Sequence, residues 1–293
     1  MPKCVAVLLH FRSAAMTLRC LQSLASEGVD IVVVVDNSED DGASIVPLRS
    51  GAAHIPAEIV YLEPGVNLGF AAGVNRAVEL IAGWGGEYDL LLINSDASLA
   101  PGTVGHLRAA VADKSPVIAA PSIDGPTGLV PARTYYRHLS ATISPAGPGL
   151  RGHALLGGAC LMLHHTLVHE PIFDETFFFY GDDIEMGYRM AQRGVALVDV
   201  PEGVVIHEGS GSSGNGSIFY EYHMSRAHLL LVGRLGYGMA GRFGLGAGRL
   251  FFLTIRALVR SVRHRSLRPW KGLGMALSDL LRGRRRSLTP PVR

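Results

Sequence analysis

Short apolar runs alternate with segments of helical spacing along the first 120 residues. Such runs fit strands that are covered on both faces of a sheet. Strands that alternate with helices favour an open, mostly parallel sheet with helices on both sides, so we predict an α/β fold. The predicted strands are residues 5–9, 31–35, 59–62, 88–93 and 117–120, and the predicted helices are residues 13–25, 70–82 and 101–112.

The pattern loosens after residue 121. Residues 122–153 are rich in Gly, Pro and Ser, so we expect loops or an irregular insertion there. The later elements are predicted as a strand at 155–163, a helix at 182–193, a strand at 195–200, a flexible Ser/Gly loop at 209–216 and mostly helices from 218 onward.

Charge divides the chain into two parts. The 293 residues carry a net charge of +2, but residues 1–222 hold 12 basic and 24 acidic side chains, whereas residues 223–293 hold 15 basic side chains and one acid, Asp279. We expect the two parts to face different surroundings. The three cysteines lie in apolar segments without disulfide or zinc spacing, which favours the cytoplasm. The N-terminal apolar run is too short for a signal peptide or a membrane span.

Ligands of open parallel sheets bind at the carboxyl ends of the strands. The first predicted strand leads into His10 and Arg12 without a glycine, which argues against a dinucleotide-binding turn. The second ends at Asp36, which could accept hydrogen bonds from a ribose or base; a plain Asx turn is the alternative. The third leads into NLGFAAGVN, whose glycines could let the backbone approach a ligand. Such helix starts are also common in packed sheets.

The fourth predicted strand ends in Asn94, Ser95 and Asp96. A carboxylate at the end of a buried strand is costly unless it binds something. A divalent cation on a diphosphate is one such partner, because Mg²⁺ needs only one or two protein oxygens; a cap for the helix after Pro101 is the alternative. His207 follows an apolar run and could complete the cation site, or it could be structural.

An acidic cluster follows an aromatic run in FFFYGDDIEMGYR. The aromatic residues 177–180 should be buried or line a pocket. Asp182, Asp183 and Glu185 would then be partly desolvated, which raises pKa and suits proton abstraction. The alternative is a helix N-terminus whose first-turn acids complement the helix dipole.

Taken in order, these segments resemble the inverting glycosyltransferases of family 2, and most of all their bacterial rhamnosyltransferase-like branch. The resemblance covers roughly residues 5–230. It implies a GT-A (Rossmann-like) catalytic domain at 1–222, with a nucleotide-sugar half near 1–120 and an acceptor half near 150–222, and a basic helical extension at 223–293. The matching segments are DNSED (36–40), NLGFAAGVN (67–75), LLLINSDA (90–97), LLGGACLML (155–163), FDETFFFYGDDIEMGYRMAQRG (173–194) and VIHEGSGSSG (205–214).

The resemblance also implies a reaction. A sugar, rhamnose or another hexose or deoxysugar, would move from a UDP-, dTDP- or GDP-linked donor to a hydroxyl of a glycan, lipid-linked glycan or small natural product. Asp183 would be the general base, and Asp182 and Glu185 would orient it or the acceptor. Asp96 and His207 would hold Mg²⁺ or Mn²⁺. The residues implied at the nucleotide sugar are His10, Arg12, Asp36, Asn67, Gly69, Asn75, Asn94, Ser95, Asp96, Gly157 and Gly158.

Three departures from the family pattern stand out. Asn94 replaces the first acid of the metal-binding DxD motif, which leaves a single carboxylate. Asp182 replaces the usual Glu, so either of the paired acids could be the base. The first strand ends in His-Phe-Arg where relatives usually have a Tyr-Asn or similar pair, so Arg12 could contact the donor differently.

Arginines recur every seven residues in the C-terminal part, at Arg242, Arg249, Arg256 and Arg263, with apolar residues on another face. We expect an amphipathic helix whose basic side meets an anionic membrane, on the inner face of the cell membrane. The alternative is a helix packed on the catalytic domain or at a homodimer interface with its arginines in solvent. Further arginines that extend this charge are Arg260, Arg282, Arg284, Arg285 and Arg286.

Other kinds of function fit less well. Nucleic acid is not expected as a partner, because aromatic residues are not interleaved with the charges. A sugar-nucleotide pyrophosphorylase would need a Gly-rich basic loop after the first strand, and HFRSAAM does not supply one. A non-catalytic carbohydrate-binding or scaffold protein would not need Asp96, Asp183 and His207 together.

Overall fold

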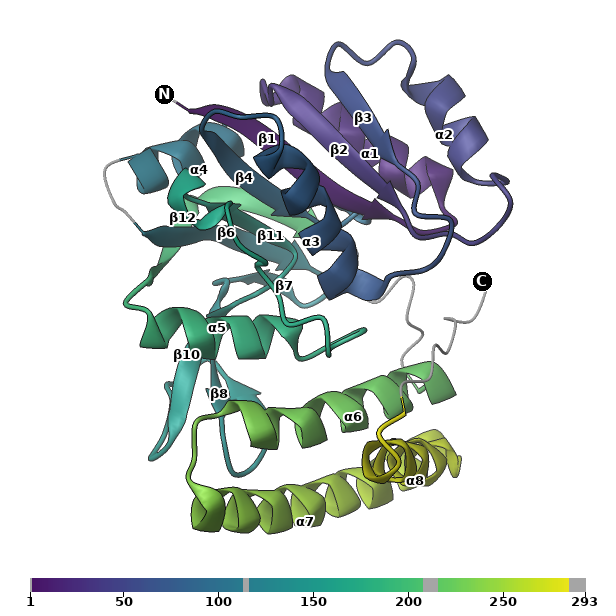
Figure 1. The fold of residues 1–293 in the computed structure, drawn as a ribbon, viewed down its shortest axis with the longest axis vertical. Helices are drawn as coiled ribbons and strands as arrows, with labels where there is room; N and C mark the ends of the chain where they lie inside the picture. The colour runs from purple at the N-terminus through teal and green to yellow at the C-terminus, as the bar shows by residue number, and fades with distance from the viewer. Residues whose placement is uncertain (1, 113–115, 208–215, 285–293) are drawn as a thin grey trace.

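The computed structural model describes residues 2–112, 116–207 and 216–284 (Figure 1). Its centre is a nine-stranded sheet of order β3-β2-β1-β4-β11-β6-β12-β5, with β7 paired to β6, and a three-stranded sheet β10-β8-β9 lies apart from it. The strands are β1 Lys3–His10, β2 Ile31–Asp36, β3 Glu58–Leu62, β4 Tyr88–Ile93, β5 Ala97–Leu99, β6 Val117–Gly125, β7 Gly128–Val130, β8 Arg133–Arg137, β9 Thr142–Ser144, β10 Gly152–Leu156, β11 Cys160–Leu163 and β12 Ala196–His207. The helices are α1 Ala14–Ser26, α2 Ile45–Ala52, α3 Gly69–Ala82, α4 Thr103–Ala112, α5 Asp182–Gln192, α6 Ile218–Arg234, α7 Met239–His264, α8 Arg268–Leu281 and a 3-10 turn at His165–Leu167.

The first four strands of the path form the predicted parallel sheet. β1 pairs in parallel with β2 and β4, and His10 faces Asp36 across the β1–β2 pair. The other half is mixed, because β11 runs antiparallel between β4 and β6, and β12 pairs antiparallel with β5. The carboxyl ends of β1, β2 and β4 therefore meet at one edge, as the strand-end argument requires.

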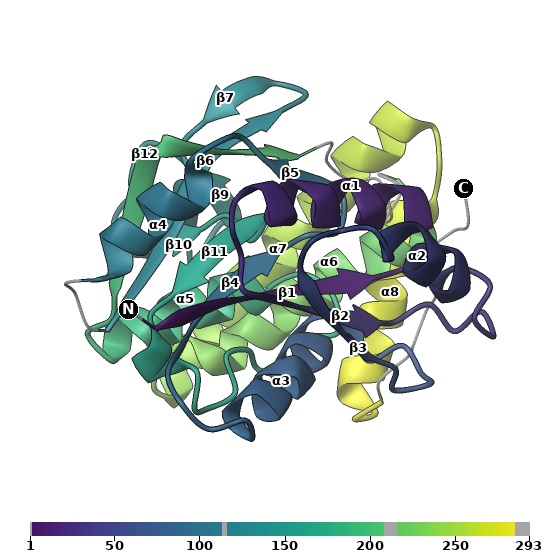
Figure 2. The same cartoon turned by 90° about the horizontal axis from the view of Figure 1, so that it is seen from above.

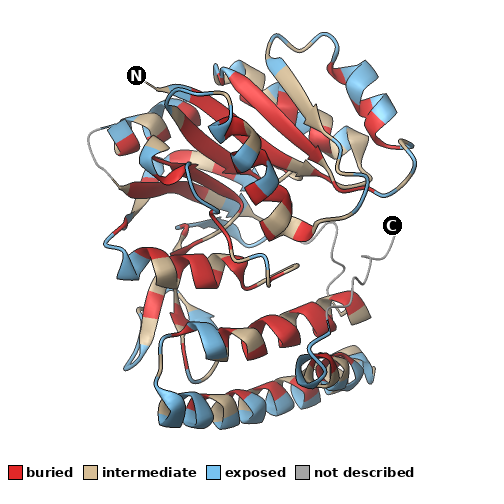
Figure 3. Ribbon diagram, viewed as in Figure 1, coloured by how far each residue is buried: buried red, intermediate tan, exposed pale blue. Residues whose placement is uncertain are grey.

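Helices cover both faces of the sheet, as predicted. One buried apolar cluster packs α1, α2 and α4 on one face, and a second packs α3 and α5 on the other. Figure 2 shows α1 and α3 on opposite sides of β1. The strands β1, β2, β4 and β11 are buried almost throughout (Figure 3), which explains their unbroken apolar sequence.

Residues 122–153 are not the irregular insertion that we predicted. They contain the end of β6 and the strands β7, β8 and β9, whose residues are mostly exposed or half-buried and so show no apolar run. The predicted strand at 155–163 is also wrong, since Gly157 to Ala159 divide it into β10 and β11. α2, which contains a proline, and the three-residue β5 were missed, and α4 begins at Thr103 instead of Pro101.

Several arginines of α7 pack against the rest of the protein, whereas we expected them to face a membrane or solvent. The Arg249 side chain is fully buried beside Tyr136, and Arg256 and Arg260 both bond to the buried Glu221 of α6. Of the arginines predicted to face solvent or a membrane, Arg249 is therefore buried and Arg256 and Arg260 are half-buried, whereas Arg242 and Arg263 are exposed. None of the helices within the described ranges is long and apolar enough to cross a bilayer.

Some predictions stay as they were. α6 begins before residue 222, so the proposed domain boundary falls within a helix, and no observation tests that boundary. The predicted loop at 209–216, apart from Gly216, lies outside the described residues, as do Arg285 and Arg286.

Candidate active site

The end of β4 and the end of β12 bring Asp96 and His207 together. β5 pairs with β12 so that Ala97 faces His207, which places Asp96 one residue from that pair. His207 Nε2 lies 3.1 Å from Asp96 Oδ1 and 3.5 Å from Asn94 Nδ2. Asp96 and His207 are 111 positions apart in the chain, and the pairing of the short strand β5 with β12 makes them neighbours.

This pair fits a divalent cation that takes most of its ligands from elsewhere. An octahedral ion with bonds of about 2.1 Å holds adjacent ligand atoms about 3.0 Å apart, close to the observed separation of the carboxylate and imidazole atoms. Within the described residues no group of three or more His, Cys, Asp or Glu could hold a metal ion. The remaining ligands would be phosphate and water oxygens, as is usual for Mg²⁺ and Mn²⁺ on a diphosphate.

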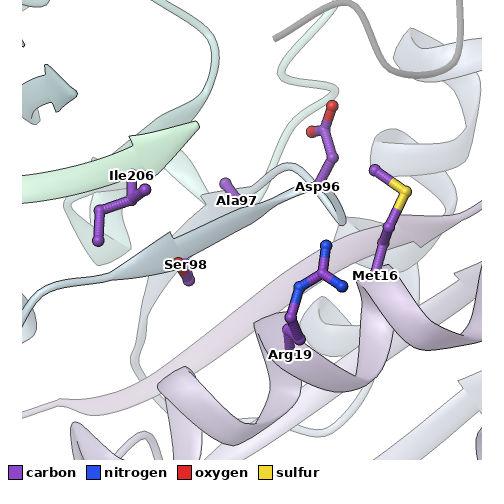
Figure 4. A pocket seen from close by; sticks show the side chains of 6 residues that line it. All are labelled: Met16, Arg19, Asp96, Ala97, Ser98 and Ile206. Atoms are coloured by element: carbon purple, nitrogen blue, oxygen red, sulfur yellow. The ribbon is translucent and has the colours of Figure 1, made fainter. Parts of the chain in front are cut away.

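A small pocket of about 30 Å³ lies beside Asp96. Met16 and Arg19 extend into it from α1, and Ser98 and Ile206 line it from β5 and β12 (Figure 4). Arg19 thus brings a positive charge into the pocket beside Asp96, and it was not among the predicted site residues. Its sequence signal is that it is the one charged residue between Ala14 and Ser26.

Arg12 and Asp36 form a second part of the same edge. The Arg12 backbone N–H donates to Ser38 Oγ at 3.0 Å and its Nε donates to the Ser38 carbonyl at 2.9 Å. Asp36 Oδ1 accepts from the Ser38 N–H at 3.0 Å, so the Asx turn weighed as an alternative is present. That turn uses one carboxylate oxygen of the half-buried Asp36 and does not exclude a ligand on the other.

The loop before α3 is tied to the loop after β2. Asn37 Nδ2 donates to the Gly69 carbonyl at 3.0 Å, and Glu39 accepts from the Asn67 N–H at 2.8 Å. Asn67 Oδ1 in turn accepts from the Gly69 N–H at 2.9 Å. Asn37 and Glu39 were not among the predicted site residues, although both lie in the DNSED segment.

Gly69 is required by the neighbouring acidic segment. Its φ is +77°, and a Cβ there would lie 2.5 Å from the Phe178 carbonyl oxygen, which accepts the Phe70 N–H. Gly69 therefore lets the α3 loop contact the aromatic run ahead of Asp182. The glycine thus permits a close approach between two protein segments.

Gly69→Ala is expected to destabilise the protein by about 2–4 kcal/mol, because it combines a backbone clash with left-handed strain. Gly65 is a matched control: its φ is +74°, but nothing lies within 4 Å of its Cβ position. Gly65→Ala should cost only about 1 kcal/mol. Denaturant unfolding of both variants measures the difference, and equal losses would contradict the role of the Phe178 contact.

The paired acids at the start of α5 have different environments. Asp182 is buried, and burial together with Asp183 and Glu185 raises the pKa of Asp182 to about 8. Asp183 is half-buried and accepts from the Ile184 N–H at 2.8 Å; burial raises its pKa as well. The cluster is both a helix start and a desolvated acid pair, so the two interpretations of the sequence hold together.

The segment from Gly157 to Ala159 joins the two groups of acids. A Cβ on Gly158 would lie 4.0 Å from the Asp183 Cβ, and the Ala159 carbonyl accepts from the Asn94 N–H at 3.0 Å. This short stretch of backbone therefore contacts both Asp183 and Asn94, whose side chain lies 3.5 Å from His207 Nε2. Gly157, whose Cβ position is 2.8 Å from Ile123, is a packing position.

Three predicted site residues are engaged elsewhere. His10 has no exposed surface, and its ring nitrogens lie 2.8 Å from Thr17 Oγ1 and 2.9 Å from Ser44 Oγ. Asn75 is buried, and its amide bonds to the backbone of Phe173. Glu185 pairs with Arg189 at 3.1 Å. These three side chains hold the surrounding segments together, and the roles predicted for them at the donor or the acceptor stay predictions.

The aromatic run packs against α6, as the expectation of burial requires. Phe177 is buried, Phe178 stacks on His223 with ring centroids 5.3 Å apart, and Phe179 contacts Phe219. Gly181 approaches Ala227 so closely that a Cβ would lie 2.8 Å from it. The first C-terminal helix is therefore part of the wall around Asp182, which the charge division of the sequence did not suggest.

A buried network of imidazole and phenol groups lies behind α5. His153 Nε2 lies 2.8 Å from the Ile184 carbonyl, and His138 Nε2 lies 2.8 Å from His153 Nδ1. Burial lowers the pKa of His138 to about 4. Tyr136, bonded to Arg249 of α7, continues the network. No pattern in the sequence predicted this network, since Tyr136, His138 and His153 fall in the segment expected to be irregular.

Comparisons with known proteins agree with this architecture. No protein-family model matches the chain. It is 26% identical over 286 residues to the N-acetylglucosaminyl-diphospho-decaprenol L-rhamnosyltransferase of Mycobacterium tuberculosis, which covers 85% of this chain and 91% of that protein. The structure resembles the mannosyltransferase PcManGT of Pyrobaculum calidifontis in complex with GDP-Man and Mn²⁺, with a TM-score of 0.58, 15% identity and coverage of 96% of this chain and 87% of that one. The chain is a glycosyltransferase with the GT-A fold.

A second structural neighbour supports the same fold. The S. aureus protein TarS matches with a TM-score of 0.52 and 15% identity, and the alignment covers 96% of this chain and 92% of the TarS fragment. TarS has also been solved in complex with UDP-GlcNAc. The glycosyltransferase assignment excludes the purely non-catalytic role weighed above.

Proposed function

We propose that this glycosyltransferase moves a rhamnosyl group from a nucleotide diphosphate donor to a lipid-linked N-acetylglucosamine, with inversion at the anomeric carbon. The observation that carries the proposal is that the backbone from Gly157 to Ala159 lies beside Asp183 and bonds to Asn94, whose side chain is near His207 of the Asp96–His207 pair. The choice of donor and acceptor follows the M. tuberculosis relative, which aligns over most of both chains. Assignment to family 2 rests on the sequence motifs.

The reaction is a single displacement. The acceptor hydroxyl oxygen bonds to the anomeric carbon while its proton passes to a carboxylate oxygen of Asp183. The bond from that carbon to the diphosphate oxygen breaks, and the diphosphate leaves with the electron pair. Because attack is opposite to the leaving group, the configuration inverts. Burial raises the pKa of both acids, and we assign the base role to Asp183 because it is the less buried of the two and lies beside Gly158.

Asp96 and His207 would hold Mg²⁺ or Mn²⁺ with the diphosphate. When bound, the cation would stabilise the charge that develops on the leaving group. Arg19, at the edge of the Asp96 pocket, supplies a further positive charge there. Arg12 and Asp36 are proposed to contact the nucleoside end of the donor, since they lie at the ends of the neighbouring strands β1 and β2.

The proposal is tested by incubating the protein with Mn²⁺ or Mg²⁺, a lipid-linked diphospho-N-acetylglucosamine and each of several nucleotide sugars. We expect rhamnosyl transfer from dTDP-rhamnose to exceed transfer from UDP-glucose, UDP-N-acetylglucosamine or GDP-mannose, with the product detected by mass spectrometry. Transfer of another sugar alone would overturn the donor. Equal use of free N-acetylglucosamine would overturn the lipid-linked acceptor.

A further inference from the structure

We propose that the outer face of α7 is a docking surface for an anionic lipid bilayer. The helix α7 lies at the edge of the molecule farthest from the central sheet (Figure 1), and much of it is exposed (Figure 3). The surface is a stripe of exposed apolar side chains along one side of this helix. It includes Phe243, 82% exposed, Phe251, 62% exposed, and Val262, 72% exposed. The other exposed apolar members are Met239, Leu250, Ile255, Leu258 and Val259.

The orientation of α7 is set by its inner face. Arg249 bonds to Tyr136 and to the His138 carbonyl, while Arg256 and Arg260 bond to the buried carboxylate of Glu221. Leu253 and Ala257 pack with α6 and α8 in a buried cluster. These buried polar contacts would be left unpaired if the helix rotated, so the apolar stripe is held toward the outside.

The stripe follows helical geometry over most of α7. Residues 243, 247, 250, 251, 254, 255, 258 and 262 recur at three- and four-residue intervals, which places them on one face. Apart from Ala247 and Thr254, all are large apolar side chains. A continuous exposed apolar face of this kind marks an interaction surface.

The charge around this stripe identifies the occupant. Arg263, Arg265, Arg268 and Lys271 follow at the end of α7 and the start of α8, and all are exposed. Between residues 235 and 284 the sequence has a single acid, Asp279, which is buried and accepts from the Tyr222 hydroxyl. Apolar insertion flanked by uncompensated basic charge suits a bilayer with anionic headgroups.

Two further observations favour a bilayer over a second copy of the chain as the partner of this surface. Trp270 and Leu267 lie exposed beside these basic residues, and tryptophan is favoured at the headgroup level of a bilayer. A two-fold pairing of α7 with a second copy would instead bring the basic ends together with the exposed Arg242 and without any acid. That arrangement is repulsive, whereas an anionic surface is attractive.

The test is sedimentation of the full chain with vesicles. We expect binding to vesicles of equal parts phosphatidylglycerol and phosphatidylcholine at low salt, and at least about tenfold weaker binding to phosphatidylcholine alone. The double variant Phe243→Glu/Phe251→Glu should lose at least about tenfold in affinity for the anionic vesicles. Leu129→Glu is the matched control, because Leu129 is 61% exposed on β7, and it should bind as the wild type does.

A second variant set separates charge from apolar insertion. Arg263→Gln/Arg265→Gln/Arg268→Gln should weaken anionic-vesicle binding at least about tenfold and reduce its salt dependence. Circular dichroism checks that all variants keep their helices. The proposal is overturned if the wild type ignores anionic vesicles, if Phe243→Glu/Phe251→Glu binds them unchanged, or if light scattering shows that this double variant only dissociates a dimer. None of these readouts depends on sugar transfer, so failure here leaves the proposed function standing.

Discussion

Asp183→Asn is expected to lower the transfer rate by about 10²–10⁴-fold, because the acceptor hydroxyl loses its general base. Asp182→Asn is the matched control one residue away, and its amide mimics the protonated carboxyl that Asp182 keeps at neutral pH. We expect less than about a tenfold loss for it. Transfer rates with saturating donor measure both. A large loss in Asp182→Asn alone would show that the roles of the two acids are reversed.

The raised pKa of Asp182 also predicts that the free energy of unfolding depends on pH. Asp182 holds its proton up to about pH 8 in the folded protein, against a pKa of 3.8 in the unfolded chain. The folded state therefore binds more protons in this interval, so the free energy of unfolding falls as pH rises, by up to about 1.4 kcal/mol per pH unit. Asp182→Asn should remove this slope between pH 6.5 and 8, where unfolded histidines are mostly neutral. An unchanged slope in denaturant titrations would contradict the raised pKa.

Removal of the divalent cation is the second change with a large expected effect. Chelation should lower transfer by about 100-fold or more, since a cation on the leaving diphosphate contributes several kcal/mol of charge stabilisation. Asp96→Ala should do the same, and His207→Ala should weaken Mn²⁺ binding by about 10–100-fold. Electron paramagnetic resonance of free Mn²⁺, with the nucleoside diphosphate present, measures binding independently of activity.

Asp124→Asn is the control for loss of a nearby carboxylate. Asp124 is exposed on β6, in register with Ile206 beside His207, yet it is not part of the Asp96 pocket. It should bind Mn²⁺ as the wild type does. Unchanged transfer after chelation, or equal Mn²⁺ affinity in Asp96→Ala and the wild type, would show that the pair is held together only by its own hydrogen bond.

The strand ends were predictable from sequence because the strands are buried on both faces and so are apolar throughout. Asp36 and Asp96 could be placed at one edge of the sheet for that reason. The contact between Asp96 and His207 could not be derived the same way. It depends on β5, a three-residue strand whose pairing with β12 leaves no pattern in the sequence.

Burial of single polar side chains was harder to predict than the fold. His10 and Asn75 stand in matching motifs, yet hydrogen bonds to Ser44, Thr17 and Phe173 enclose them. Their partners lie up to 98 positions away, beyond the reach of local spacing. Which of two adjacent acids is more exposed likewise depends on how α5 meets its surroundings.

The arginine repeat predicted an amphipathic helix but not which of its residues would be buried. Arg249 is buried while Arg242 and Arg263 are exposed, and Leu245 is buried while Val259 is exposed, so neither predicted side has a single environment. The buried carboxylate of Glu221, on another helix, holds Arg256 and Arg260 against α6. A pattern within one helix contains no information about such a partner.

The anomeric configuration of the transferred sugar tests the central claim most directly. In-line attack with Asp183 as base predicts a product whose configuration is opposite to that of the donor, which nuclear magnetic resonance of the glycosidic proton and carbon resolves in a single experiment. A product that retains the donor configuration would contradict the single displacement and the role given to Asp183.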